Sequence, residues 1–178
     1  MGEIKATESW FARRVEEEAK KDIIPLSERL GNIVAFVAFL LFILYFVAHQ
    51  MWSTGFFTSS FGSIEMFLFY ASLLIGLVPV SVRILVGRKN LARLFDIFGY
   101  VLFIIAVVWL YVVFPFDFTH VADVLPTFVR FLLDWVSNDI ARGFMVIVMI
   151  IVPIVAIYNA VLYMFVRKEL SKPTLKPT

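Results

Sequence analysis

The sequence contains no cysteine among its 178 residues. Disulfide bonds, thiolate metal sites and thiol-based oxidation linked to quinones are therefore excluded. Charged residues are also scarce, at 17%, whereas hydrophobic residues make up 61% of the chain and the mean hydropathy is +0.90. One soluble core of a chain this long could not bury so much apolar surface. We expect the excess to face lipid.

No secretory signal is evident in residues 1–30. This segment is rich in glutamate, and it lacks the short basic start, apolar core and small-residue cleavage site of a signal peptide. We expect it to remain on the mature protein as a cytoplasmic, amphipathic helical segment. Trp10, Phe11 and Val15 give it a small apolar face, which either lies on the cytoplasmic lipid surface or belongs to a helix that is simply solvated.

Four apolar stretches are each long enough to cross a membrane. About 20 residues at 1.5 Å per residue cover the roughly 30 Å hydrocarbon layer. We therefore predict an all-α integral membrane protein with four transmembrane helices in a bundle, which forms one domain over residues 31–166. The predicted spans are residues 31–52, 64–83, 97–116 and 143–166.

The connection between the third and fourth spans is neither a span nor a simple loop. Over residues 119–137, apolar side chains recur at spacings of three and four, and charged side chains fall between them. This pattern predicts an amphipathic helix at the outer membrane surface, with Pro126 allowing a break near its start. Residues 167–178 are predicted to form a short polar tail on the opposite, cytoplasmic side.

The basic residues indicate the orientation of the spans. All but two of the 16 lysines and arginines precede the first span, lie between the second and third, or follow the fourth. Only Arg130 and Arg142 lie in the other connections. The basic side is expected to be cytoplasmic, which places both termini of a multi-pass cell-membrane protein there. Because the basic residues do not form one patch, no nucleic acid is expected as a partner.

No charged side chain lies near the centre of a span. This disfavours ion-coupled transport through a buried carboxylate, and voltage sensing. The spans do contain small or weakly polar residues, which allow helices to pack closely. They also contain prolines, which leave backbone carbonyls without a partner in the helix and available to line a pathway. No known catalytic or cofactor-binding motif is present, so we expect no cofactor and no enzymatic activity. The candidate packing or pathway residues are Ser72, Gly76, Pro79, Pro153 and Asn159.

The two histidines and three carboxylates near the predicted outer ends of the spans form a separate group. Histidine and carboxylate are ligands of zinc and other divalent metals. Their spacing matches no known hydrolase motif, and interfacial polar residues that face water would give the same pattern. We therefore assign no metal to this outer cluster, which consists of His49, Glu65, Asp117, His120 and Asp123.

Three functional hypotheses follow from these observations. The first is a non-catalytic membrane protein that acts by association in the lipid bilayer, as a homo-oligomer or as an accessory subunit of a larger membrane complex. The second is a small channel or carrier whose pathway passes Pro79, Pro153 and Asn159. The third is an outward-facing metal-dependent enzyme built on the outer histidines and carboxylates.

Overall fold

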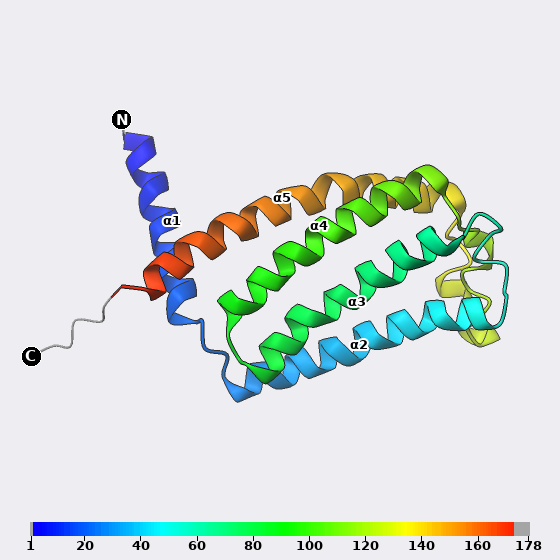
Figure 1. Cartoon of the computed structure of the whole chain (residues 1–178), viewed down its shortest axis with the longest axis horizontal. Coiled ribbons are helices and arrows are strands. Elements are labelled where there is room, and N and C mark those ends of the chain that lie inside the picture. Colours follow the sequence, from blue (N-terminus) through cyan, green and yellow to red (C-terminus); the bar gives the residue numbers. More distant parts are fainter. Residues whose placement is uncertain (1, 173–178) are drawn as a thin grey trace, which may run out of the picture.

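The computed structural model describes residues 2–172, with side chains from residue 10 onward. Over these residues the chain forms α-helices and two short 3₁₀ helices (Figure 1). The α-helices α2 to α5 are long and apolar enough to cross a membrane, which confirms the four predicted apolar stretches. The α-helices are α1 (Gly2–Lys20), α2 (Leu26–Met51), α3 (Ser63–Leu85), α4 (Lys89–Val113) and α5 (Asn138–Leu170).

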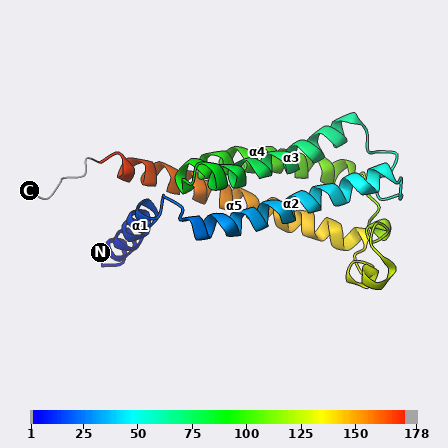
Figure 2. The ribbon, with the colours of Figure 1, turned by 90° about the horizontal axis from the view of Figure 1, so that it is seen from below.

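The four long helices pack in the order of the chain. Helix α2 packs on α3, α3 on α4 and α4 on α5. Figure 1 shows them side by side in this order, and the view turned by 90° in Figure 2 shows α3 and α4 in one layer with α2 and α5 in the other. Among the described residues, α2 and α5 do not pack extensively on each other. The helices therefore form a trough whose open side lies between α2 and α5.

The two ends of the trough differ in chemistry. At one end lie the connections over residues 49–63 and 109–137, which we call the aromatic end. At the other end lie residues 13–29, 83–93 and 167–172, which we call the basic end; helix α1 and the last turn of α5 meet there (Figure 1).

Helix α1 packs against the end of α5. Val15 is buried against Leu162 and Val166, and the Phe11 ring meets Phe165 edge-on with 5.3 Å between ring centroids. This docking is available because α5 has 33 residues, about 50 Å, and so extends beyond the length needed for a span. Phe11 and Val15 of the apolar face therefore contact protein, whereas Trp10 is 57% exposed.

The predicted outer helix over residues 119–137 is not continuous. The segment contains two 3₁₀ helices, η1 (Phe118–His120) and η2 (Thr127–Leu132), joined by turns. Pro126 has no N–H to donate, and the Arg130 guanidinium instead satisfies the carbonyls of Leu125 at 3.0 Å and Asp123 at 3.1 Å. The prediction of one amphipathic helix was wrong for this reason. Its apolar side chains are nevertheless exposed: Phe128, Phe131, Leu132 and Trp135.

All four long helices begin before their predicted spans: α2 begins at Leu26 and α3 at Ser63. Helix α4 begins at Lys89 rather than near residue 97, so Asp96 lies inside the helix and cannot cap its N-terminus. Helix α5 begins at Asn138, where the Ser137 hydroxyl accepts a hydrogen bond from the N–H of Ile140 at 3.3 Å. Apolar length alone did not reveal these polar first turns.

Candidate functional site

His49 of the outer cluster is fully buried at the end of α2. Its Nε2 lies 3.1 Å from the carbonyl oxygen of Val121, and its Nδ1 lies 2.6 Å from the Thr54 hydroxyl. A carbonyl only accepts hydrogen bonds, so Nε2 carries the proton and Nδ1 accepts from Thr54. The Tyr45 hydroxyl donates to the same Val121 carbonyl. Nε2 thus attaches the loop after α4 to α2, and Nδ1 holds the loop that directly follows α2.

Glu65 makes hydrogen bonds at the start of α3. One carboxylate oxygen accepts the backbone N–H of Gly62 at 3.1 Å, which also donates to the Ser60 carbonyl at 3.0 Å. The other oxygen accepts the indole N–H of Trp109 at 2.8 Å and so ties α3 to α4. Neither contact brings Glu65 to the histidines.

The remaining members of the outer cluster make local contacts. Asp117 accepts from the backbone N–H and hydroxyl of Thr119 and from the Asn138 amide, and these hydrogen bonds lower its pKa. His120 pairs with Asp123 at 2.8 Å. In the part of the chain that the structure describes, no group of three histidine or acidic side chains is placed to hold a metal ion.

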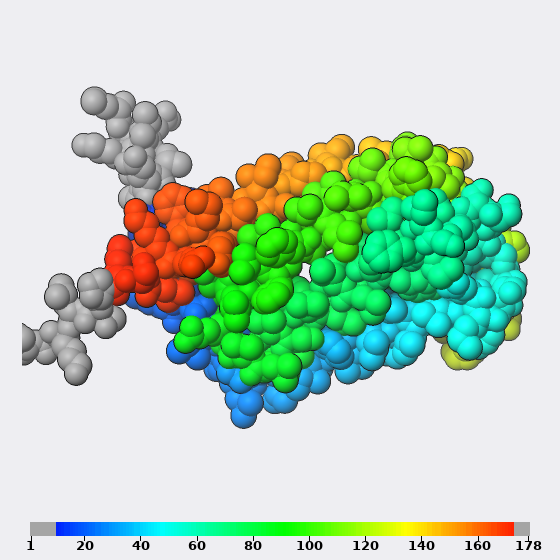
Figure 3. Space-filling view, in the orientation of Figure 1, coloured from blue at the N-terminus to red at the C-terminus, as the bar shows by residue number. Residues whose placement is uncertain are grey.

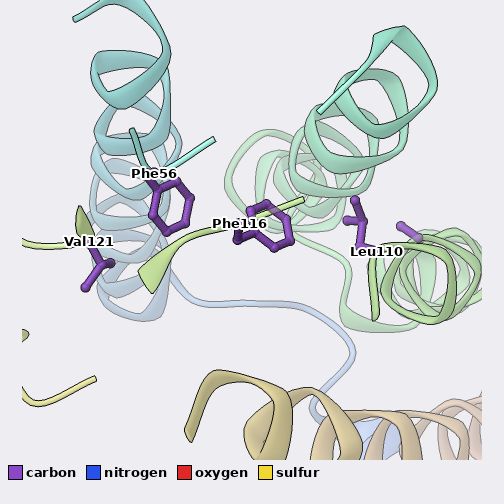
Figure 4. Packing of buried hydrophobic residues seen from close by; sticks show 5 residues of the cluster. Phe56, Leu110, Phe116 and Val121 are labelled. Atoms are coloured by element: carbon purple, nitrogen blue, oxygen red, sulfur yellow. The ribbon is translucent and has the colours of Figure 1, made fainter. Parts of the chain in front are cut away.

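An aromatic core fills the aromatic end. Figure 4 shows Phe56 and Phe116, which are both buried, with 5.6 Å between ring centroids. Leu110 and Val121 complete the labelled cluster. The backbone supports it, since the N–H of Asp117 donates to the Phe56 carbonyl at 2.7 Å. Phe56 and Phe116 lie in connections without a helical period, so their packing on each other could not be predicted from the spacing of apolar residues.

The middle of the trough contains a cavity of about 340 Å³ that is open to one side. Three of the candidate packing or pathway residues of α3 line it: Ser72, Gly76 and Pro79. An added Cβ at Gly76 would lie 3.0 Å from the Phe39 ring of α2, so a larger residue there requires this ring to shift. Figure 3 shows a small opening in the surface between α3 and α4. Further lining residues are Phe39, Phe42, Leu73, Asp96, Gly99, Tyr100, Phe103 and Val152.

The two candidate residues of α5 do not line this cavity. Pro153 is partly exposed, and the Asn159 side chain donates to the carbonyl of Val155 on its own helix at 2.9 Å. Asn159 therefore makes no hydrogen bond across a helix interface. The structure brings Ser72, Gly76 and Pro79 to one cavity, whereas Pro153 and Asn159 are not among its lining residues.

A second cavity, also about 340 Å³, lies at the basic end and shares Asp96 with the first. Arg83 of α3 pairs with Asp96 across the α3–α4 interface. Lys89 pairs with Glu28 of α2 at 3.1 Å. The remaining lining residues are Ile24, Asn32 and Arg93.

Asp22 caps α4 from the N-terminal segment. Its carbonyl accepts the N–H of Lys89 at 2.8 Å, and its carboxylate accepts the N–H of Asn90 at 2.7 Å. Arg88, the residue before α4, makes no side-chain cap of its own. The Asn90 amide in turn donates to the carbonyl of Tyr163 in α5 at 3.4 Å. Asp22 and Asn90 are both buried and together join three segments of the chain.

Arg93 and Arg29 extend this network. Arg93 donates to the Asn90 side chain at 3.2 Å and to Glu18 of α1 at 2.8 Å. The Arg29 guanidinium covers Gly87, where an added Cβ would lie 1.9 Å from it and where φ is +68°. The positive φ favours glycine at that position, and any larger residue would also displace the Arg29 side chain.

Comparison with known proteins found no family model, curated protein or solved structure that matches the chain.

The sequence reasoning missed the whole basic-end network. From the sequence, the basic residues are interpreted only as orientation signals. Asp22, Asn90 and Glu18 are polar residues outside the apolar stretches, and contacts between segments more than 60 residues apart leave no local pattern.

Proposed function

We propose that this chain is a multi-pass membrane protein, with the basic end in the cytoplasm, that acts without catalysis by associating with other subunits in the bilayer. The four apolar helices support insertion. The distribution of lysine and arginine supports the orientation. The polar side chains of the outer cluster support a structural role, because each of them has a local partner.

The observation that carries the proposal is an exposed stripe on α2. Its side chains follow one another at alternating steps of four and three, the spacing of a helix that packs against another helix. They are between 48% and 70% exposed, and neither α3 nor α5 covers them. Such a stripe can pair with a second copy across a two-fold axis. The stripe consists of Leu30, Val34, Val37, Leu41 and Leu44.

Disulfide formation between copies tests this association surface. Since the chain lacks cysteine, one introduced cysteine reports on a single position. Leu41→Cys on the stripe and Ile154→Cys on α5 are a matched pair, since the two residues are 61% and 63% exposed. Under oxidation in membranes, Leu41→Cys should form a covalent dimer and Ile154→Cys should not. Equal dimer formation at both positions, or none at Leu41→Cys, contradicts the proposed surface.

The orientation has its own test. Ser59 is exposed at the aromatic end and Ser171 at the basic end. A maleimide that cannot cross membranes should label Ser59→Cys in intact cells, whereas Ser171→Cys should react only after the cells are opened. The reverse labelling pattern contradicts the proposed orientation.

A small channel or carrier is the second candidate. The observation that favours it is the cavity around Ser72, Gly76 and Pro79, because Pro79 frees the carbonyl of Ile75 beside it. The pathway of this hypothesis also includes Pro153 and Asn159, which lie away from the cavity. Its test is a measurement of ion or solute flux through liposomes that contain the purified protein.

A further inference from the structure

The two cavities described above share Asp96 and adjoin each other along α3 and α4, and we call them together the groove. On α4, the lining residues Lys89, Arg93, Asp96, Tyr100 and Phe103 follow one another at steps of three and four, so they share one face of the helix.

The facing helices continue the same groove. On α3, the lining residues run from Arg83 through Pro79 and Gly76 to Ser72 at the same spacing. Glu28 and Asn32 of α2 line its polar end, whereas further residues of α2 line its apolar part: Phe39 and Phe42.

The chemistry changes along this groove from charged to apolar. The basic end carries the cations Arg83 and Lys89 beside the carboxylates Glu28 and Asp96. Beyond Asp96, the lining is mostly aromatic and aliphatic. A ligand that fills the groove must therefore be amphiphilic, with groups of both charge signs at one end and an apolar chain at the other.

The length of the groove matches one bilayer leaflet. From Lys89 to Phe103, α4 rises about 21 Å at 1.5 Å per residue. One leaflet with its headgroup region is about 20–23 Å thick, half of the whole bilayer. The groove is thus long enough to extend from the headgroup level to about the bilayer midplane.

We propose that the groove binds one phospholipid with an amine-bearing, zwitterionic headgroup. Its phosphate contacts Lys89 and Arg83, its ammonium contacts Glu28, and one acyl chain lies along Gly76 and Gly99. A zwitterionic headgroup is preferred to an anionic one, because each of these cations already has a carboxylate partner. This inference rests on the proposed insertion in a bilayer and not on self-association.

Native mass spectrometry of the full-length protein tests the site. Protein stripped of lipid is titrated separately with phosphatidylethanolamine, phosphatidylglycerol and soluble phosphoethanolamine. We expect one phosphatidylethanolamine per chain, binding about tenfold weaker for phosphatidylglycerol, and no binding of the headgroup alone. Equal binding of both lipids overturns the headgroup assignment. Equal binding of soluble phosphoethanolamine overturns the groove as the site.

Variants locate the bound lipid. Gly99→Leu places a side chain in the groove. The substitution is tolerable for the fold because a Cβ at Gly99 would lie 3.9 Å from the nearest atom, an ordinary contact distance. Gly143→Leu is its control, because nothing lies within 4 Å of that position on the exposed start of α5. Gly99→Leu should lose the lipid and Gly143→Leu should retain it. Retention of the lipid by folded Gly99→Leu overturns the proposal.

A substitution at the charged end of the groove tests headgroup binding without filling the apolar part of the groove. Lys89→Gln should weaken binding about tenfold, whereas Lys20→Gln, which also removes one lysine–glutamate pair, should leave binding unchanged. Equal effects of both substitutions contradict a site at Lys89.

The oligomeric state distinguishes this inference from the proposed association. A dimer that binds no lipid overturns this inference alone, and a monomer that binds lipid overturns only the proposed association.

Discussion

The Asp22 carboxylate lies 2.7 Å from the backbone nitrogen of Asn90 and caps a helix that begins almost 70 residues later in the chain. The first turn of a helix has N–H groups without partners in the helix, and a buried donor left unpaired is costly. This contact therefore links the folding of the N-terminal segment to the start of α4.

Replacement of Asp22 tests this link. Asp22→Ala should lower the free energy of unfolding by about 1–2 kcal/mol, the upper part of the range for a lost cap, because both residues are buried. Asp22→Asn keeps a side-chain acceptor and should recover most of the loss. Unfolding of the purified protein in mixed detergent micelles measures both. Wild-type stability of Asp22→Ala contradicts a capping role.

The Arg83–Asp96 pair should show strong coupling. Arg83→Met leaves the mostly buried carboxylate of Asp96 without its partner and should cost about 2–4 kcal/mol, a value reduced because Arg83 is partly exposed. The double variant Arg83→Met/Asp96→Leu removes both charges and should be more stable than Arg83→Met. Unfolding of the wild-type protein, both single variants and the double variant gives the coupling energy. If the free-energy changes of the two single variants add up to that of the double variant, a direct interaction is contradicted.

His49 should act through packing and hydrogen bonds. His49→Ala removes the bond to Val121 and a ring that lies 4.8 Å from Tyr45, so it should cost about 2–4 kcal/mol and increase proteolysis in the loop after α4. Zinc should not change the unfolding temperature of the wild-type protein. A large zinc-dependent stabilisation that His49→Ala abolishes contradicts this structural role.

Asp117 should contribute to stability in a pH-dependent way. Hydrogen bonds from Thr119 and Asn138 lower its pKa in the folded protein below the unfolded value of about 3.9. Its contribution is therefore present above the unfolded pKa and is lost as the pH falls through the folded pKa. Asp117→Asn should be less stable than wild type at about pH 6, and the difference should shrink towards about pH 3. A difference that does not change with pH contradicts the assignment.

Flux through reconstituted liposomes separates association from transport. The association account predicts no ion or solute flux above that of empty liposomes. The pathway hypothesis predicts flux that changes in Pro79→Ala, Pro153→Ala or Asn159→Ala. Because only Pro79 of these three lines the cavity, flux that responds to Pro79→Ala alone supports a pathway confined to the trough between α2 and α4.

Composition and apolar length were sufficient to predict the four long helices. Each span needs about 20 apolar residues, and that signal is local. The outer segment was harder to predict, because its spacing of three and four is that of a helix, whereas Pro126 and the contacts of Arg130 break it into turns. A periodic pattern indicates which side chains would share one face of a helix. It does not show that the backbone hydrogen bonds of the helix continue without a break.

The candidate sites also differ in how well the sequence predicted them. Ser72, Gly76 and Pro79 were chosen as small or helix-perturbing residues of one span, and the structure places all three on one cavity. The outer histidines and carboxylates were grouped only because they lie near the same predicted boundary, and nearby partners engage them separately. The contact between Asp22 and Asn90 depends on how distant segments pack, so no local pattern could reveal it.

The mass of the native particle tests the central claim most directly. Gentle extraction from the membrane followed by native mass determination should give a defined particle larger than one 20.5 kDa chain, either a homo-oligomer or a complex with other membrane subunits. A particle that contains a single copy of this chain and no other protein, at every concentration examined and in lipid nanodiscs as well as detergent, would contradict function by association.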